Sequence, residues 1–221
     1  MSRNTLVDVR IHEVISVRHI TGFTYVLRLE RNGLEFTPGQ YISIGKAGTI
    51  DKRDYSIYSA LEDNFLEVII REVQDGSVSK SLKHCKPGDK IELEGPFGFF
   101  QLKPENITDR KFLFIASGTG ISPFHSIVKS NPGLNYQLLH GVRNAEEGYD
   151  KKDYAGNNVL CTSRDGSGDY FGRVTDYLRE NPVSEDTLCY LCGNVEMIND
   201  VYDILEEQGL PSGNMHAEVY F

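Results

Sequence analysis

The feature that most constrains the fold of this chain is a change in the spacing of its apolar residues near residue 103. Before that point, short runs rich in β-branched and aromatic residues are separated by turn residues, which is typical of antiparallel strands. Strands are predicted at 7–20, 24–31, 40–44, 55–60, 65–71 and 90–94, with one short helix at 76–85. These spacings predict an antiparallel β-barrel over residues 1–103.

After residue 103, apolar runs alternate with helical segments. Strands are predicted at 111–116, 136–140, 158–162 and 188–192, and helices at 122–129, 173–180 and 195–208. Such alternation indicates a parallel sheet with right-handed crossovers. We therefore predict a Rossmann-like α/β domain over residues 104–221, with a ligand site at the carboxyl ends of its strands.

Composition narrows the function further. The 221 residues suffice for two domains, and the formal net charge of -9 argues against a nucleic-acid partner, which would require a basic surface. No stretch approaches the roughly 18 apolar residues that cross a membrane, and the first residues lack the apolar core of a secretion signal. We expect a cytoplasmic protein that binds neither nucleic acid nor membrane.

The four cysteines are not expected to hold a metal. Cys189 and Cys192 form a C-x-x-C pair, but they fall in a predicted strand, where residues three apart point to opposite faces. A single pair also cannot ligate an iron–sulfur cluster. If this chain exchanges single electrons with an iron–sulfur cluster, that cluster should therefore belong to a separate protein.

One candidate site begins at Arg53, followed by Tyr55 and Ser56. A guanidinium donates two hydrogen bonds to a diphosphate, a tyrosine offers a stacking face, and a serine hydroxyl can bond a ring nitrogen. The simpler interpretation is an edge strand with a surface arginine.

Two glycine-containing segments could bind phosphates through backbone amides. Gly76, Ser77, Val78 and Ser79 open the predicted short helix, whose free amides would favour an anion. Gly118, Thr119 and Gly120 follow the first strand of the second half, and Pro123 suits a first helical turn. Ordinary helix capping by serine explains the first segment equally well.

The remaining candidates lie near the end of the chain. Cys192 and Gly193 end the last predicted strand, and Asn194 should cap the following helix. A buried cysteine is usually only a small apolar side chain. The last residues include Glu218, Tyr220 and Phe221, whose aromatic rings could simply fill a core.

Taken in order, the motifs around Arg53, Gly95–Gly98, Gly118–Pro123, Cys192 and Glu218 resemble those of the ferredoxin-NADP reductase family, and the bacterial ferredoxin/flavodoxin-NADP reductases in particular. The resemblance implies an FAD-binding barrel followed by an NADP-binding domain. It implies that Arg53 and residues 76–79 hold the FAD diphosphate, that Tyr55 and Tyr220 flank the isoalloxazine, and that Phe221 covers the adenine. Ser56, Cys192, Glu218 and Tyr220 would surround the point of hydride transfer, and Gly118, Thr119, Gly120 and Gly193 would lie at the nucleotide.

The coenzyme is predicted from charge. Arg143, the Ser163 and Arg164 pair, and Arg173 each follow a strand or open a helix, where cationic donors could bind a 2′-phosphate. Similar arginines select NADPH in the bacterial family. The simpler interpretation is three surface arginines, but we expect no acidic residue in the place of an NAD ribose ligand after the second strand of this domain.

These residues predict a flavoenzyme that takes hydride from NADPH and passes single electrons to ferredoxin or flavodoxin, with Tyr220 as a gate. Two alternatives stay open: an NAD(P)H-dependent free-flavin or quinone reductase, and a non-enzymatic nucleotide-sensing module on the same fold.

Overall fold

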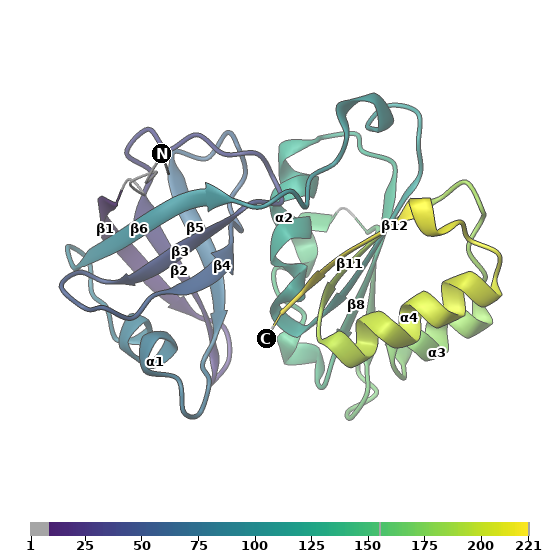
Figure 1. Ribbon diagram of the computed structural model, residues 1–221. Coiled ribbons are helices and arrows are strands. Elements are labelled where there is room, and N and C mark those ends of the chain that lie inside the picture. The colour runs from purple at the N-terminus through teal and green to yellow at the C-terminus, as the bar shows by residue number, and fades with distance from the viewer. Residues whose placement is uncertain (1–8, 155, 221) are drawn as a thin grey trace, which may run out of the picture.

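The computed structural model describes residues 9–154 and 156–220. The first half of the chain forms six strands, and every pairing between them is antiparallel. They are β1 Arg10–His19, β2 Thr24–Glu30, β3 Tyr41–Lys46, β4 Arg53–Ser56, β5 Phe65–Arg71 and β6 Lys90–Phe97. A bridge between Ile57 and Val68 joins the two ends of the sheet, which runs β4-β3-β6-β1-β2-β5. The sheet thus closes into the predicted barrel (Figure 1).

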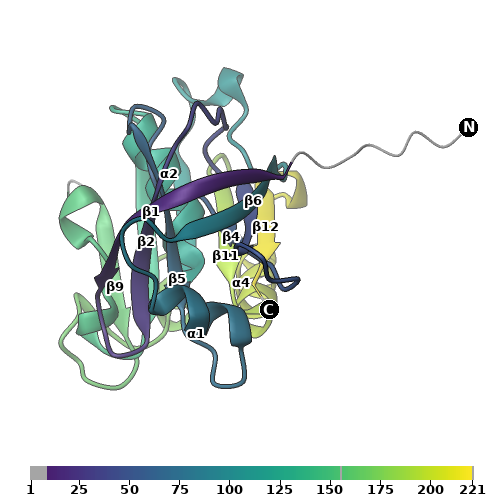
Figure 2. The same ribbon diagram turned by 90° about the vertical axis from the view of Figure 1, so that its left-hand side faces the viewer.

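One helix, α1 (Ser77–Lys83), covers the lower end of the barrel (Figure 2). Its buried Val78 and Leu82 pack into the same apolar cluster as the inward residues of the strands.

The second half forms a parallel sheet in the order β10-β9-β8-β7-β11-β12. Its strands are β7 Phe112–Ser117, β8 Tyr136–Val142, β9 Asn158–Thr162, β10 Tyr170–Phe171, β11 Leu188–Gly193 and β12 Met215–Val219. Helix α2 (Ser122–Ser130) lies between this sheet and the barrel, whereas α3 (Val174–Glu180) and α4 (Val195–Glu207) cover the other face (Figure 1). Short 3-10 helices span Pro104–Asn106, Gly118–Ile121, Ala145–Glu147, Lys151–Tyr154 and Ser212–Asn214.

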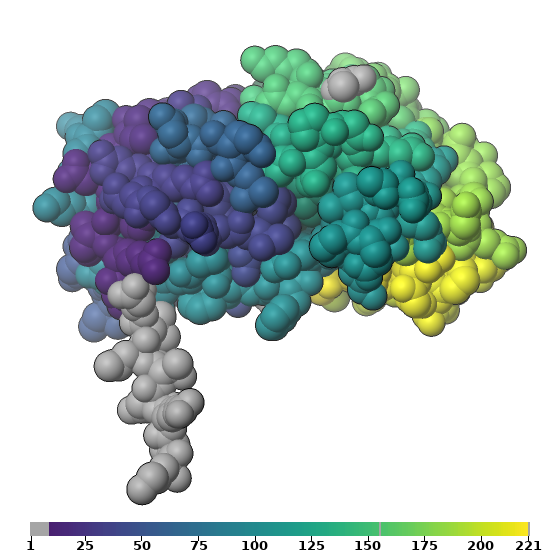
Figure 3. All heavy atoms as spheres, turned by 90° about the horizontal axis from the view of Figure 1, so that it is seen from above, coloured from purple at the N-terminus to yellow at the C-terminus, as the bar shows by residue number. Residues whose placement is uncertain are grey.

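The two domains share an apolar core. Phe114 of β7 and Phe124 of α2 stack at 4.8 Å and belong to one cluster with Val26 and Ile69 of the barrel. Seen from above, the atoms of the two domains meet along this seam (Figure 3). Burial of apolar surface on both sides fixes the barrel against α2.

The structure differs from the sequence prediction most clearly in β4 and in the tail of the chain. The strand predicted at 55–60 is β4, which ends at Ser56, because the next residues turn toward α2: the Ser126 hydroxyl donates to the Ser59 carbonyl at 2.7 Å. The tail is itself a strand, β12, paired in parallel with β11, so that Glu218 lies beside Cys192.

Candidate functional site

A cleft of about 390 Å³ opens at the carboxyl ends of the parallel strands, where the sequence predicts a ligand site. Seven of the predicted residues line it: Gly118, Thr119, Arg143, Ser163, Arg173, Gly193 and Tyr220. Residues that the sequence did not single out also contribute, above all Arg71 and Glu147.

The Gly118–Ile121 turn forms the floor of the cleft. Gly118 has a φ of +53°, and an added Cβ would have open space, so its backbone faces the cleft in a conformation that favours glycine. Gly120 is buried in the same turn, against the carbonyl of Cys192. No side chain caps the turn, which leaves its first amides available to an anion.

A buried histidine supports this turn from below. His140 of β8 is fully buried, and its Nε2 lies 2.8 Å from the Gly118 carbonyl oxygen. Since a carbonyl only accepts, Nε2 donates, and the ring is neutral with Nδ1 unprotonated. Burial lowers the pKa of His140 to about 4.

Two of the three arginines predicted to bind the 2′-phosphate lie in the cleft, and one does not. Arg143 and Arg173 line the cleft, whereas Arg164 does not, although its backbone amide donates to the Arg143 carbonyl at 3.0 Å. An acidic residue does stand in the cleft after the second strand of this domain. Glu147 follows β8, is buried in the cleft wall, and lies 3.8 Å from Arg71 of β5.

On the barrel side, β4 presents the Arg53 motif. The Arg53 side chain is exposed, and its Nη1 donates to the Lys52 carbonyl at 2.7 Å. Tyr55 is partly buried against the barrel core, and burial raises its pKa to about 12. Its neighbour Ser56 is buried and faces the second domain, where the Ser122 hydroxyl donates to the Ser56 carbonyl at 2.8 Å.

The start of α1 lies beside the start of β4. The Ser77 hydroxyl donates to the Asp51 carboxylate at 3.3 Å, and Gly76 caps the helix without a side-chain hydrogen bond. Val78 and Ser79 are buried, and the Ser79 hydroxyl already accepts from the Val73 amide at 3.1 Å. Because Ser77 is exposed whereas Val78 and Ser79 are buried, the Ser77 hydroxyl and the first backbone amides are the groups of this segment that a phosphate could reach.

Four predicted residues meet where the two domains join, and we call them the junction cluster: Ser56, Cys192, Glu218 and Tyr220. The Tyr220 hydroxyl donates to the Ser56 Oγ at 2.5 Å, and the Ser56 hydroxyl donates to Glu218 at 3.2 Å. Cys192 is fully buried beside Glu218.

Burial disfavours the charged forms of the ionisable members of the junction cluster. Burial raises the pKa of Glu218, although the hydrogen bond from Ser56 works in the opposite direction. Burial also raises the pKa values of the Cys192 thiol and the Tyr220 hydroxyl well above their ordinary values. The cluster is thus neutral around pH 7 apart from Glu218, whose protonated fraction is increased.

The remaining predictions concern Phe221, the cysteines of β11 and the cap of α4. Phe221 lies outside the described residues. Cys192 packs on the α2 face of the sheet and Cys189 on the α3 and α4 face, as the strand periodicity predicted. Asn194 caps α4, its Oδ1 accepting from the Glu196 amide at 2.9 Å.

Across 9–154 and 156–220, no group of His, Cys, Asp and Glu side chains could hold a metal ion. Within the same ranges, no helix has the length and apolar character that crossing a membrane requires.

Comparison with known proteins defines the class. The sequence profile of the family described as "Oxidoreductase FAD-binding domain" matches residues 8–102, and that of the "Oxidoreductase NAD-binding domain" matches residues 114–203. Together with the fold, these matches define a flavin-dependent oxidoreductase. The predicted fold and the predicted FAD and nicotinamide nucleotide binding domains are confirmed.

Individual relatives point to one family. The chain is 41% identical over 122 residues to methane monooxygenase component C of Methylosinus trichosporium, across 53% of this chain and 35% of that protein. It is 28% identical to a flavodoxin/ferredoxin–NADP reductase of Rhodobacter capsulatus, across 90% of this chain and 86% of the relative. A ferredoxin NADP+ reductase from Neisseria gonorrhoeae, solved with FAD and NADP, has the same fold, with a TM-score of 0.86 at 24% identity over 96% of this chain and 99% of that one.

The chain belongs to the ferredoxin-NADP reductase-like family of flavoenzymes. It spans 35 to 66% of the length of the first curated relatives that it matches.

Proposed function

We propose that this protein is an FAD-dependent reductase that takes hydride from NADPH and passes electrons singly to a separate ferredoxin or flavodoxin. The observation that carries this proposal is the junction cluster, in which β4 of the barrel, the end of β11 and the chain's tail bring Ser56, Cys192, Glu218 and Tyr220 together. We also propose that the domain boundary lies between residues 103 and 104.

The barrel side fits a flavin dinucleotide. Arg53 offers an exposed guanidinium, and the adjacent start of α1 offers the Ser77 hydroxyl and uncapped amides, a donor set suited to a diphosphate. Tyr55 offers a ring for stacking beside Ser56. When bound, FAD would supply the chemistry that accepts a hydride and releases single electrons.

The cleft side fits a nicotinamide dinucleotide. The amides of Gly118 and Thr119 would hold the pyrophosphate, with Gly193 close by, and Arg143, Arg173 and Ser163 would bind the 2′-phosphate end. Arg71 adds a cation from the barrel to the same cleft.

Within the junction cluster, the Ser56 hydroxyl would hydrogen bond the flavin, and Glu218 would place a carboxyl group of raised pKa near the reacting atoms. Tyr220 lines the nucleotide cleft while its hydroxyl bonds Ser56 in the barrel. Its ring therefore occupies the boundary that a nicotinamide has to cross, and productive binding requires the ring to move.

A second coenzyme is favoured by one observation. Glu147 stands in the cleft wall, and a carboxylate there could accept a hydrogen bond from a ribose 2′-hydroxyl but would repel a 2′-phosphate. NADH is therefore the alternative donor. The pairing with Arg71 offsets part of the repulsion, so NADPH stays our first proposal.

The acceptor and the compartment are proposals of the same kind. The flavodoxin/ferredoxin–NADP reductase among the relatives supports a small carrier protein. Two lysines of the barrel are closely paired with carboxylates: Lys52 bonds Glu94 at 2.6 Å and Lys83 bonds Glu72 at 2.5 Å. Four unpaired, buried cysteines support a reducing compartment, which we take to be the cytoplasm.

The test is to extract the flavin from the purified protein and then to measure anaerobic flavin reduction by NADPH and by NADH. FAD, faster reduction by NADPH, and cytochrome c reduction that depends on added ferredoxin or flavodoxin would support the proposal. FMN, or no flavin after reconstitution, would contradict it. Faster turnover with free FMN or a quinone would favour the free-flavin or quinone reductase. Absence of nucleotide oxidation would favour the sensing module.

A further inference from the structure

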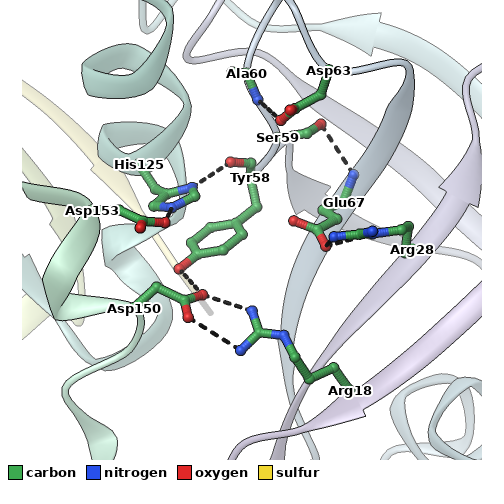
Figure 4. Close-up of polar contacts among 10 residues, drawn as sticks. All are labelled: Arg18, Arg28, Tyr58, Ser59, Ala60, Asp63, Glu67, His125, Asp150 and Asp153. Atoms are coloured by element: carbon green, nitrogen blue, oxygen red, sulfur yellow. Dashed lines mark hydrogen bonds and ion pairs between the residues drawn. The ribbon is translucent and has the colours of Figure 1, made fainter.

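A polar contact away from the junction cluster joins the two domains. Arg18 of β1 forms a bidentate ion pair with Asp150, with its Nη1 3.1 Å from Oδ1 and its Nη2 2.6 Å from Oδ2. The Tyr58 hydroxyl donates to the same Oδ2 at 2.9 Å. One carboxylate of the α/β domain thus accepts three hydrogen bonds from the barrel side (Figure 4).

Asp150 is well adapted to this position. Its φ is +44°, a conformation that aspartate and asparagine tolerate better than most other residues. Burial alone would raise the pKa of its carboxyl, but the bonds from Arg18 and Tyr58 hold that pKa below its ordinary value. The Asp150 side chain is 17% exposed and the Arg18 side chain 48%, so it is the carboxylate end of this ion pair that is shielded from water.

Tyr58 is fixed in turn by α2. Its ring stacks on that of His125 at 3.7 Å with an interplanar angle of 8°, and its carbonyl oxygen lies 2.6 Å from His125 Nδ1. His125 Nε2 lies 3.1 Å from Asp153. Both ends of the segment 150–153 are therefore tied to the same tyrosine, directly or through His125 (Figure 4).

The segment belongs to a loop that also builds the nucleotide cleft. We call residues 143–154, which lie between β8 and β9, the bridging loop. Its first part places Arg143 and Glu147 in the cleft, and Tyr149 bonds Thr24 of the barrel at 3.3 Å. One side of the loop thus faces the nucleotide while the other is fastened to the barrel.

We propose that Asp150, through Arg18 and Tyr58, is a positioning residue that sets the bridging loop, and with it the nucleotide cleft, against the flavin domain. The inference rests on the proposed function, since it concerns the distance over which hydride passes. Hydride transfer needs close alignment, and a displacement of about 1 Å can cost about a hundredfold in rate. None of the three residues lines the cleft, so they act through the loop.

The variant Asp150→Asn tests this inference on the full-length holoenzyme, because asparagine tolerates the same backbone conformation but lacks the charge. Two half-reactions are followed anaerobically by stopped flow: flavin reduction by the nucleotide that reduces the wild type faster, and reoxidation of the reduced flavin by ferricyanide. Only the first depends on how the cleft faces the flavin. We expect flavin reduction to slow about tenfold and reoxidation to stay at the wild-type rate.

Two further variants sharpen the result. Tyr58→Phe keeps the stacking on His125 and removes one hydrogen bond, so it should slow reduction in the same direction but less. Lys151→Ala is the matched control: it breaks a neighbouring ion pair of similar length, 2.7 Å to Asp169, but that pair stays within the second domain. This control should change neither half-reaction.

Reduction of Asp150→Asn at the wild-type rate would overturn the positioning role. So would an equal loss in both half-reactions, or loss of the flavin, because each would indicate a purely structural contact. If the wild type itself is reduced by neither nucleotide, the proposed function fails and the positioning role fails with it. That outcome is distinct from a reducible wild type beside an equally reducible variant.

Discussion

The two halves of the candidate site, the nucleotide cleft and the barrel side, would bind a ligand through different groups: backbone in the first and side chains in the second. The nucleotide cleft is floored by backbone, the Gly118–Ile121 turn and the ends of parallel strands, with arginines at its rim. The barrel side relies on individual side chains, above all Arg53, Tyr55 and Ser56 of β4. A backbone floor depends on conformation, whereas a side-chain site depends on each functional group. Single substitutions should therefore act differently in the two halves.

The largest effect is expected on the side-chain half. Arg53→Ala should weaken FAD binding about a hundredfold or more, because charged hydrogen bonds contribute roughly 1.5–3 kcal/mol each and a guanidinium donates two. Fluorescence titration of the apoprotein with FAD measures this. Arg53→Lys keeps the charge but not the two-pronged hydrogen bonding, so its affinity for FAD should lie between those of the wild type and Arg53→Ala. An unchanged FAD affinity in Arg53→Ala would place the diphosphate elsewhere.

In the nucleotide cleft, the buried His140 supports the backbone turn, and its titration should make the stability of the protein depend on pH. His140 has a folded-state pKa of about 4, against 6.5 for an unburied histidine, so the unfolded chain binds the proton first as the pH falls. Its contribution to the free energy of unfolding is complete above pH 6.5 and is lost between 6.5 and 4, by about 3 kcal/mol.

Urea denaturation at several pH values measures this loss. His140→Gln removes the titration and retains an N–H donor for the Gly118 carbonyl, so its stability should vary less over the same pH window. An identical pH dependence in the variant would show that other groups cause the loss.

The rim of the cleft should show an intermediate effect on coenzyme choice. Replacing Arg143 and Arg173 with alanine should raise the KM for NADPH by some tens of fold and that for NADH far less, if both bind the 2′-phosphate. Arg164→Ala is the matched control, because Arg164 is an exposed arginine beside the cleft that does not line it. Equal effects on both coenzymes would remove the basis for NADPH selection.

The smallest effect is expected from the backbone itself. Gly118→Ala should cost about 1 kcal/mol of stability because of its positive φ, and should raise the KM for the nucleotide about fivefold. Gly133→Ala has the same kind of strain, at φ +93° and with open space for the Cβ, but lies outside the cleft. It should lose similar stability at an unchanged KM. If Gly118→Ala and Gly133→Ala had the same KM for the nucleotide, the Gly118–Ile121 turn would not contact it.

Sequence periodicity was sufficient for the elements that local patterns define. Strands β5 and β9 coincide with their predictions. The four-residue β4 was predicted too far along the chain, because beyond Ile57, which bridges Val68 of β5, the carbonyls of Tyr58 and Ser59 bond side chains of α2. The two-residue β10 and the tail strand β12 are too short or too polar to predict and depend on pairing with β9 and β11.

The site shows the same division. Residues within motifs, such as Ser56, Gly118 and Glu218, could be found because their chemistry and spacing are visible in the sequence. Arg71, Arg18 and Asp150 could not, since their roles arise from contacts between the domains. Glu147 did leave a signal, an acidic residue shortly after β8, and that signal was overlooked.

The central claim is that hydride passes at the junction cluster and that Tyr220 blocks the nicotinamide there. The most direct test is to measure the Kd values of Tyr220→Ser and wild type for NADPH and NADH, together with the rates of flavin reduction. Because the ring no longer has to be displaced, both coenzymes should bind more tightly, and NADH should gain more, since it lacks the 2′-phosphate contacts that help displace the ring. Unchanged binding of both coenzymes with the wild-type preference would contradict the account.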